Sequence, residues 1–276
     1  MKEVIVITGV AQGMGREVAR LLAEAGDSVA GFDVDREGIE SLKKELSEIG
    51  GEHLLVPLDI TDRKGIIKFR NDVLKRFDKV DTVLSNVGIG FFGAFEEIDL
   101  EKALKCFEIN VIGASAIFKA FIPHMRENRQ GKLIAMSSLV GQIPFPFESI
   151  YTGTKFAIEG IVQSLLLELK PFGIQMAMIE PAQVSTTFAA KIHWLPEKTS
   201  PYHDRVKRFI DKDNELIKTA PDPERAAKVM FKVLKKKKLK LRYQIDFMSS
   251  FFITINKYLP KSIRDFILVS YMDIKV

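Results

Sequence analysis

The sequence predicts an α/β fold in which one doubly wound parallel sheet is covered by helices on both faces. Short apolar runs alternate along the first 180 residues with amphipathic segments of ten or more residues. Because parallel strands are joined by long crossovers, usually helices, this alternation indicates right-handed β-α-β units. A glycine-rich turn follows the first apolar run, and a chain of 276 residues, 46% of them hydrophobic, is long enough to bury a full core.

Each expected strand contains a run of apolar residues, which suits a sheet that is buried on both faces. We expect strands at residues 4–8, 28–32, 53–58, 82–85, 132–137 and 174–179. We expect helices at residues 16–25, 36–49, 64–77, 100–125, 151–169 and 223–236. Pro123 is a candidate kink in the long fourth helix.

We assign residues 1–243 to one domain and residues 244–276 to an apolar, phenylalanine-rich C-terminal extension. The alternation stops after Pro181, and residues 185–220 are expected to be a long polar and aromatic connection that serves as a lid. Charged residues interrupt the extension, so it is not expected to span a bilayer. It either covers the domain or a partner subunit, or it lies on a membrane surface beside the basic run at 235–242.

The charge and cysteine content exclude several classes of protein. The net charge of +5 is concentrated in the lysine run, which is compatible with the solvated end of a helix, and no nucleic-acid-binding motif accompanies it. Cys106 is the only cysteine and the four histidines are scattered, so we expect neither a disulfide nor a metal site. The apolar start is too short and acidic for a secretory signal, and we expect a cytoplasmic protein, with peripheral membrane contact as the alternative.

The glycine-rich turn has the form Thr-Gly-x-x-x-Gly-x-Gly and lies between the first strand and the first helix. Backbone N–H groups and the helix dipole can hold a pyrophosphate at such a turn, where side chains would collide with the phosphates. Its expected cofactor-binding residues are Gly9, Gln12, Gly13, Met14 and Gly15.

Asp33 ends the second expected strand, where a carboxylate can hydrogen-bond an adenosine ribose. The same carboxylate would repel a 2′-phosphate, so the sequence favours NAD(H) over NADP(H). Arg16 and Arg36 are the counter-evidence, although solvated helix starts also explain them.

Tyr151 and Lys155 are four residues apart on an expected helix, so they share one face. A nearby ammonium favours the phenolate, so Lys155 is expected to lower the pKa of Tyr151. Ser138 stands thirteen positions before Tyr151, at the end of the fifth strand.

These motifs resemble the short-chain dehydrogenase/reductase family, over about residues 3–190. Asp59-Ile60 resembles the adenine-contacting pair of that family, and Ser85-Asn86-Val87-Gly88 resembles its Asn-Asn-Ala-Gly turn, with Ser and Val as departures. The resemblance gives the catalytic residues as Asn110, Ser138, Tyr151 and Lys155. It further gives, as nicotinamide contacts, the segment containing Pro181, Val184 and Thr186, in which Ala182 replaces the usual glycine.

The resemblance implies a Rossmann-type fold and hydride transfer between a nicotinamide and an alcohol or ketone. Tyr151 would exchange the hydroxyl proton, Ser138 would bind the substrate oxygen, and Lys155 would bind the nicotinamide ribose. Asn110 would hold a water that connects Lys155 to solvent. It also implies a homodimer or homotetramer assembled through helices 100–125 and 151–169.

The segments expected around the substrate are apolar, which favours a lipid-, steroid-, retinoid- or long-chain-like alcohol or ketone. The substrate-pocket candidates are Phe92, Phe145, Phe188 and Trp194. Glu148 and Glu180, near the motifs, are interpreted as surface or packing residues. The alternatives are an NADP(H)-dependent carbonyl or 3-oxoacyl reductase, or a catalytically silent nucleotide sensor on the same fold.

Overall fold

A seven-stranded parallel sheet forms the centre of the molecule, with strand order β3-β2-β1-β4-β5-β6-β7. The computed structural model describes residues 2–184 and 196–275. The strands are β1 (Val4–Thr8), β2 (Ser28–Asp33), β3 (Leu54–Pro57), β4 (Thr82–Ser85), β5 (Gly131–Met136), β6 (Ile174–Glu180) and β7 (Arg242–Gln244). The order reverses beside β1, which is where ligands bind in open parallel sheets.

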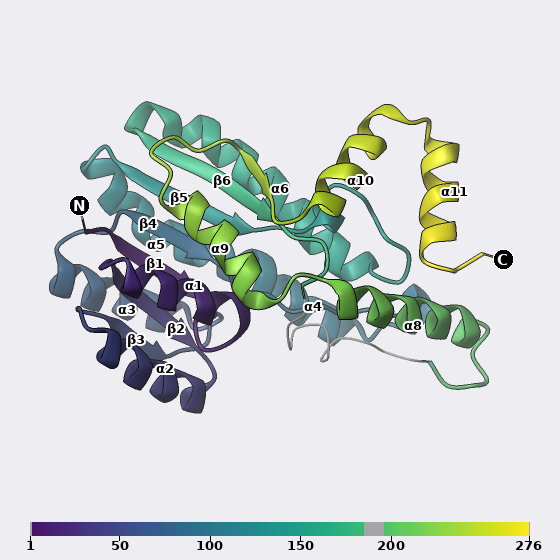
Figure 1. The fold of residues 1–276 in the computed structure, drawn as a ribbon, viewed down its shortest axis with the longest axis horizontal. Coiled ribbons are helices and arrows are strands. Elements are labelled where there is room, and N and C mark those ends of the chain that lie inside the picture. Colours follow the sequence, from purple (N-terminus) through teal and green to yellow (C-terminus); the bar gives the residue numbers. More distant parts are fainter. Residues whose placement is uncertain (1, 185–195, 276) are drawn as a thin grey trace.

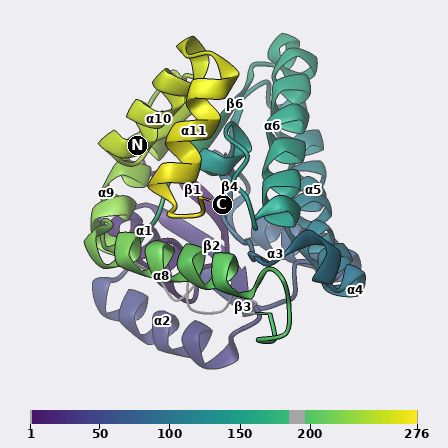
Figure 2. The ribbon, with the colours of Figure 1, turned by 90° about the vertical axis from the view of Figure 1, so that its right-hand side faces the viewer.

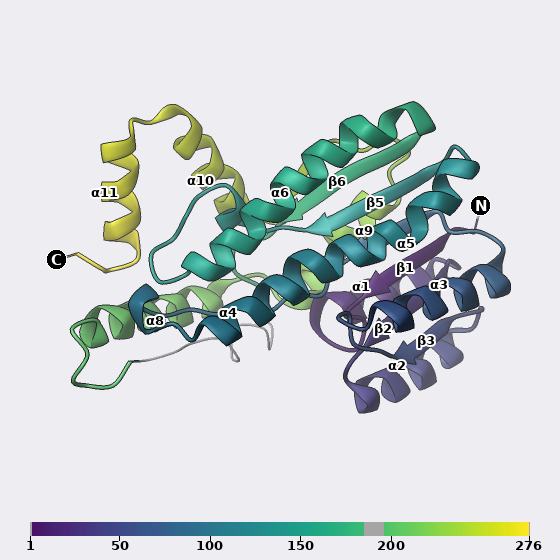
Figure 3. The ribbon, with the colours of Figure 1, turned by 180° about the vertical axis from the view of Figure 1, so that it is seen from behind.

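Helices cover both faces of the sheet (Figures 1 and 3). One face carries α1 (Gly13–Glu24), α2 (Arg36–Ile49) and α9 (Pro223–Leu234). The other face carries α3 (Arg63–Phe77), α5 (Ala114–Glu127) and α6 (Ser149–Leu169). Successive residues of β1 serve the two cores in turn: Ile5 and Ile7 pack on the α1 side, and Val4 and Val6 pack on the α5 side. The fold class predicted from the sequence is thereby confirmed.

The long helix expected at 100–125 is interrupted near its middle. It comprises α4 (Leu100–Phe107), a π-helical segment at Glu108–Gly113, and α5. The π-helical turn contains Asn110, a predicted catalytic residue, as wide turns at functional sites often do. The span Leu100–Glu127 is long and apolar enough to cross a membrane, but half of its most apolar window is buried, as in a core helix.

The segment at 185–220, expected to be a long polar and aromatic connection, contains a helix that was not predicted from the sequence. Residues His203–Thr219 form α8, a helix of 17 residues. Val206, Phe209 and Asp213 are buried at helical spacing along it. The helical repeat of these buried residues was not recognised in the sequence because most of the other residues of the segment are charged.

The extension folds as two helices, α10 (Phe247–Tyr258) and α11 (Lys261–Tyr271). They lie beyond the carboxyl ends of the strands, beside α8 (Figure 2). One face of this helical pair joins a third apolar cluster that also contains Tyr151, and Met272 and Ile274 are fully buried. The other face leaves Phe247, Tyr258 and Phe266 more than two-thirds exposed.

Candidate active site

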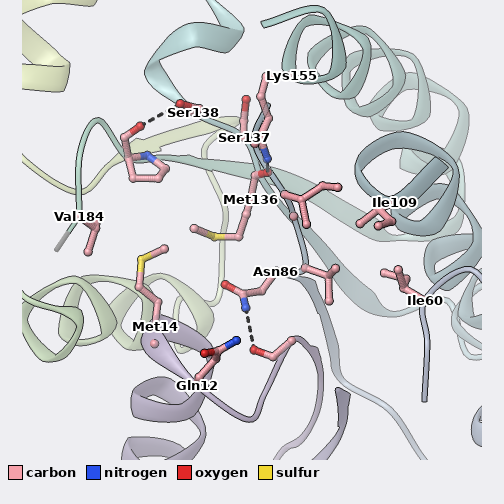
Figure 4. Close-up of a pocket in the computed structure, with 18 of the residues that line it drawn as sticks. Gln12, Met14, Ile60, Asn86, Ile109, Met136, Ser137, Ser138, Lys155 and Val184 are labelled. Atoms are coloured by element: carbon pink, nitrogen blue, oxygen red, sulfur yellow. Dashed lines mark hydrogen bonds between the residues drawn. The ribbon is translucent and has the colours of Figure 1, made fainter. Parts of the chain in front are cut away.

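A cavity of about 540 Å³ lies at the carboxyl ends of the central strands. Figure 4 shows Gln12 and Met14 on one side of it, with Ser138 and Lys155 on the other. The predicted site residues that line it are Gly9, Gln12, Gly13, Met14, Gly15, Asp33, Asp59, Ile60, Asn86, Val87, Gly88, Ser138, Tyr151, Lys155, Pro181 and Val184. Residues that are distant in sequence thus meet in one space, whose volume lies within the usual range of ligand-binding pockets.

The glycine-rich turn is packed too closely for side chains. Gly9 and Gly13 have φ angles of 69° and 56°, which favour glycine. A Cβ on Gly15 would lie 2.0 Å from the Gly9 carbonyl oxygen and 2.7 Å from Asn86 Nδ2. Asn86 Nδ2 in turn donates to the carbonyl oxygens of Thr8 and Gly9, at 3.1 and 3.0 Å. The turn therefore presents bare backbone at the start of α1, and these residues fit a dinucleotide pyrophosphate.

Asp33 is fixed at one end of the cavity. Its carboxylate accepts hydrogen bonds from the backbone N–H groups of Ala11 and Asp35, both at 3.1 Å. Arg16 is directed elsewhere: its guanidinium donates to the carbonyl oxygens of Ala11 and Gly38 and pairs with Glu45 at 2.7 Å. A carboxylate, and not this arginine, is thus the charged group at the position expected for the ribose.

Ser138, Tyr151 and Lys155 come together from the end of β5 and the first turns of α6. Lys155 Nζ donates to the Met136 carbonyl oxygen at 2.8 Å and lies 5.4 Å from the centre of the Tyr151 ring. Ser138 is hydrogen-bonded to Tyr151, and its Oγ lies 3.3 Å from the Pro181 carbonyl oxygen. All three side chains are buried, so a reaction at this point is screened from bulk water.

Burial is the largest influence on the pKa values of Tyr151 and Lys155. It raises the pKa of the Tyr151 phenol, Glu148 raises it further, and the hydrogen bond with Ser138 lowers it. Burial lowers the pKa of Lys155 to about 8. The prediction that Lys155 lowers the pKa of Tyr151 is therefore wrong for this structure, because burial raises that pKa and the Lys155 ammonium donates to the Met136 carbonyl oxygen instead.

Asn110 lies in the π-helical turn at the back of the site. Its Oδ1 accepts from the Ile89 N–H at 2.8 Å, and its Nδ2 donates to the Ile89 carbonyl oxygen and to Thr154 Oγ1. A Cβ on Gly88 would lie 3.5 Å from Asn110 Oδ1 and 3.6 Å from Lys155 Nζ. The space above Gly88 thus has room for a small polar molecule between the two side chains.

The substrate-pocket predictions fall into two groups. Phe92 and Phe145 belong to the apolar cluster around Tyr151, and the Phe92 ring meets the Tyr151 ring edge-on at 5.7 Å. The other two substrate-pocket predictions, Phe188 and Trp194, lie outside the described residues, as does Thr186, which was predicted as a nicotinamide contact.

Sequence reasoning missed several residues of this region. Phe209, Met272 and Ile274 are fully buried in the cluster with Tyr151. The surface interpretation of Glu148 and Glu180 is wrong, because their exposed fractions are 5% and 0%. Glu180 has a packing role, accepting hydrogen bonds from Gln142 and Gln244. The only sequence signal for Glu148 was its position three residues before Tyr151.

Comparison with known proteins identifies the family of the chain. A family model described as short chain dehydrogenase matches residues 3–194. The 3-ketodihydrosphingosine reductase of Bacteroides thetaiotaomicron is 26% identical, covering 96% of this chain and 96% of its own. Human 17-beta-hydroxysteroid dehydrogenase type 1 is 28% identical, covering 88% of this chain and 77% of its own. A short-chain dehydrogenase structure from Streptomyces avermitilis superposes with a TM-score of 0.80 at 28% identity, covering 96% of this chain and 94% of its own.

The fold and the relatives define a nicotinamide-dependent oxidoreductase. The chain belongs to the short-chain dehydrogenase family. It is an enzyme that acts on CH–OH and carbonyl groups with NAD(P). Other solved structures of this fold are complexes with NAD or with NADP, so the fold itself is compatible with either cofactor.

Proposed function

We propose that the protein interconverts a hydroxyl and a carbonyl group on a hydrophobic substrate, with NAD(H) as its preferred cofactor. The observation that carries this proposal is the position of Tyr151. Its ring packs in an apolar cluster, while it lines the cofactor cavity together with Ser138 and Lys155. A phenol between a dinucleotide site and an apolar space can exchange a proton with a lipophilic alcohol.

The residues of the chain divide the chemistry among them. NAD(H) would supply hydride transfer at the nicotinamide, held by the glycine turn, Asp33 and Lys155. Tyr151 would accept the hydroxyl proton during oxidation and return it during reduction. Ser138 would hydrogen-bond the substrate oxygen, where negative charge develops. Asn110, facing Lys155 across the space above Gly88, would hold the water through which that proton reaches solvent.

The preference for NAD(H) rests on Asp33. Its buried carboxylate is held by two backbone N–H groups, so it cannot easily turn away from a ribose. A 2′-phosphate in the same place would meet a like charge, and Arg16, engaged with Glu45, is not placed to offset it. An NADP(H)-dependent carbonyl or 3-oxoacyl reductase is the alternative, and the cofactor assay below separates the two.

A hydrophobic substrate is supported by the third apolar cluster and by the relatives. Leu139 and Phe145 follow Ser138, Phe209 comes from α8, and Met272 and Ile274 come from the extension. This favours the interpretation of the extension as a cover over the active site. Two similar enzymes are named for a steroid and a ketodihydrosphingosine, both lipophilic molecules.

We also propose that the outer face of the extension touches a membrane surface and that the enzyme is a homo-oligomer. Phe247, Tyr258 and Phe266 are exposed beside lysines of the same helices, an arrangement that suits anionic headgroups. Sedimentation with anionic vesicles at low salt would test this contact. Protein that stays wholly in the supernatant would refute it. For the oligomer, Leu100, Leu104 and Leu167 leave an apolar surface on α4 and α6 that a second subunit would cover.

Initial rates test the proposed function. Steroid, retinoid, long-chain and short polar alcohols and ketones are assayed, each with NAD(H) and with NADP(H). We expect turnover of lipophilic substrates with a preference for NAD(H). A preference for NADP(H) would refute the argument from Asp33. Cofactor binding without turnover of any substrate would favour the silent sensor.

A further inference from the structure

Thr154 stands between Tyr151 and Lys155 in the sequence, and its side chain is completely enclosed. Its exposed fraction is 0%. Threonine is a poor residue for the interior of a helix, and burying a hydroxyl group costs free energy unless the group is hydrogen-bonded. An apolar residue would suit this position better if packing were its only role. The hydroxyl group therefore requires an explanation from its contacts.

The Thr154 hydroxyl group joins two parts of the reaction centre. It donates its hydrogen to the Tyr151 carbonyl oxygen at 2.7 Å, three residues back along α6. Because a hydroxyl group has one hydrogen, its oxygen acts toward Asn110 as an acceptor. Asn110 Nδ2 donates to that oxygen at 3.0 Å from the π-helical turn. The hydroxyl group thus connects Asn110 to the turn of α6 that carries Tyr151 and Lys155.

The bond with Thr154 completes the hydrogen bonding of the Asn110 amide. The Ile89 carbonyl oxygen accepts from Nδ2 at 2.7 Å, and Oδ1 accepts the Ile89 N–H at 2.8 Å. Within residues 2–184 and 196–275, the other acceptors for Nδ2 are the Thr154 oxygen and the Cys106 sulfur at 3.4 Å, and sulfur is a weak acceptor. Asn110 is 3% exposed, so without Thr154 the second Nδ2 hydrogen would be buried without a good partner.

The orientation of this amide decides which of its atoms faces Lys155. With Nδ2 held by Ile89 and Thr154, Oδ1 borders the space above Gly88, where one point lies 3.5 Å from Oδ1 and 3.6 Å from Lys155 Nζ. Oδ1 can hold a water there by accepting one of its hydrogens, which leaves the water oxygen to receive a proton from Lys155. If the amide turned its freed N–H toward this space, that N–H would compete with the ammonium for the water oxygen.

We propose that Thr154 is a positioning residue for the proton path, because its hydroxyl group holds the Asn110 amide with Oδ1 toward Lys155. This inference rests on the proposed function and deepens it. Thr154 does not line the cavity, so it acts through Asn110 and not by contact with the cofactor. Its loss should therefore slow proton exchange and leave NADH binding intact.

Thr154→Val tests the proposal, because valine nearly preserves the shape and lacks the hydroxyl group. With a lipophilic substrate that the wild type converts, kcat should fall at least about tenfold. KM and the dissociation constant for NADH should each change less than about 3-fold. The ratio of kcat in H₂O to kcat in D₂O should increase, since proton exchange becomes the slower step. Thr154→Ser keeps the hydroxyl group and should retain at least about a third of the wild-type kcat.

Thr152→Val is the matched control, because it makes the same substitution on the same helix. Thr152 is also buried, at 8% exposure, but its Oγ1 has no hydrogen-bond partner within residues 2–184 and 196–275. Its kcat and its solvent isotope effect should equal those of the wild type.

A double-variant cycle tests whether Thr154 acts through Asn110. In an Asn110→Ala background the amide is gone, so adding Thr154→Val should lower kcat by less than about 2-fold. The full tenfold loss in that background would overturn the proposal.

Other results would also overturn it. Wild-type kcat in Thr154→Val would refute this inference alone, whereas no turnover of any lipophilic substrate by the wild type would refute the proposed function. A lower kcat without a larger solvent isotope effect would mean that Thr154 only supports the fold. If Thr154→Val does not fold, Thr154→Ala and Thr154→Ser give the same comparison, since they differ in the hydroxyl group alone. The alanine variant should then have the lower kcat by at least about tenfold, and equal values would refute the proposal.

Discussion

Replacing Gly15 by alanine tests the structural basis of cofactor binding. The added Cβ would lie 2.0 Å from the Gly9 carbonyl oxygen, where ordinary contact begins near 3.4 Å. The atom it meets belongs to the backbone and cannot rotate away, so the glycine turn must move by more than about 1 Å. We expect a loss of roughly 1–3 kcal/mol in the free energy of unfolding. This corresponds to a melting temperature lower by ~2–4 °C for each kcal/mol.

The same displacement should affect the cofactor more than the fold. The moved backbone holds the N–H groups expected to bind the pyrophosphate, so the dissociation constant for NADH should rise at least about tenfold. NADH fluorescence titration and thermal unfolding measure the two effects on one preparation. Gly160→Ala is the control, because no atom lies within 4 Å of the added Cβ and the residue is exposed in mid-helix. It should stabilise the protein by about 0.5–1 kcal/mol and leave NADH binding unchanged. Wild-type NADH affinity in Gly15→Ala would refute this placement of the cofactor.

Three further predictions concern the cofactor charge, the proton path and the buried carboxylates. Asp33→Asn keeps an acceptor for the Ala11 N–H but removes the charge, so the ratio of kcat/KM for NADH to that for NADPH should fall at least about tenfold; an unchanged ratio would contradict the role of Asp33. Gly88→Ala fills the space between Asn110 Oδ1 and Lys155 Nζ without a clash, so turnover should fall while the melting temperature stays nearly constant; normal turnover would exclude a water at that position. Burial and a neighbouring carboxylate raise the pKa of Glu180 to about 8 in the folded protein, above its unfolded value, so the folded state holds a proton that the unfolded state has released. The free energy of unfolding should therefore decline from pH 5 to pH 8, and Glu180→Gln should flatten this decline; an equally steep decline in the variant would refute the assignment.

The parts of the site that were predictable from the sequence depend on local backbone rules. The glycine turn needs positive φ and bare backbone, and Tyr151 and Lys155 need only a helical repeat. Each is encoded within a few consecutive residues. Strand alternation was predictable for the same reason, because both faces of a parallel sheet demand continuous apolar runs.

The missed features depend on contacts between distant segments. β7 is three residues long and half-buried, so it has no apolar run to predict it, and it exists because Arg242 and Gln244 pair with the edge of β6. The burial of Glu148 requires the turn at Phe147 and the packing of α8, and neither has a local signal. The π-helical turn at Asn110 was missed because the apolar pattern of the sequence continues through it, so the sequence predicts one uninterrupted helix.

Turnover by Tyr151→Phe is the most direct test of the central claim that this phenol is the acid and base of the reaction. Phenylalanine preserves the ring contact with Phe92 and removes only the hydroxyl group. With a lipophilic substrate that the wild type converts, we expect kcat to fall at least about 100-fold, while NADH titration gives a dissociation constant close to that of the wild type. Wild-type turnover by the variant would contradict the mechanism.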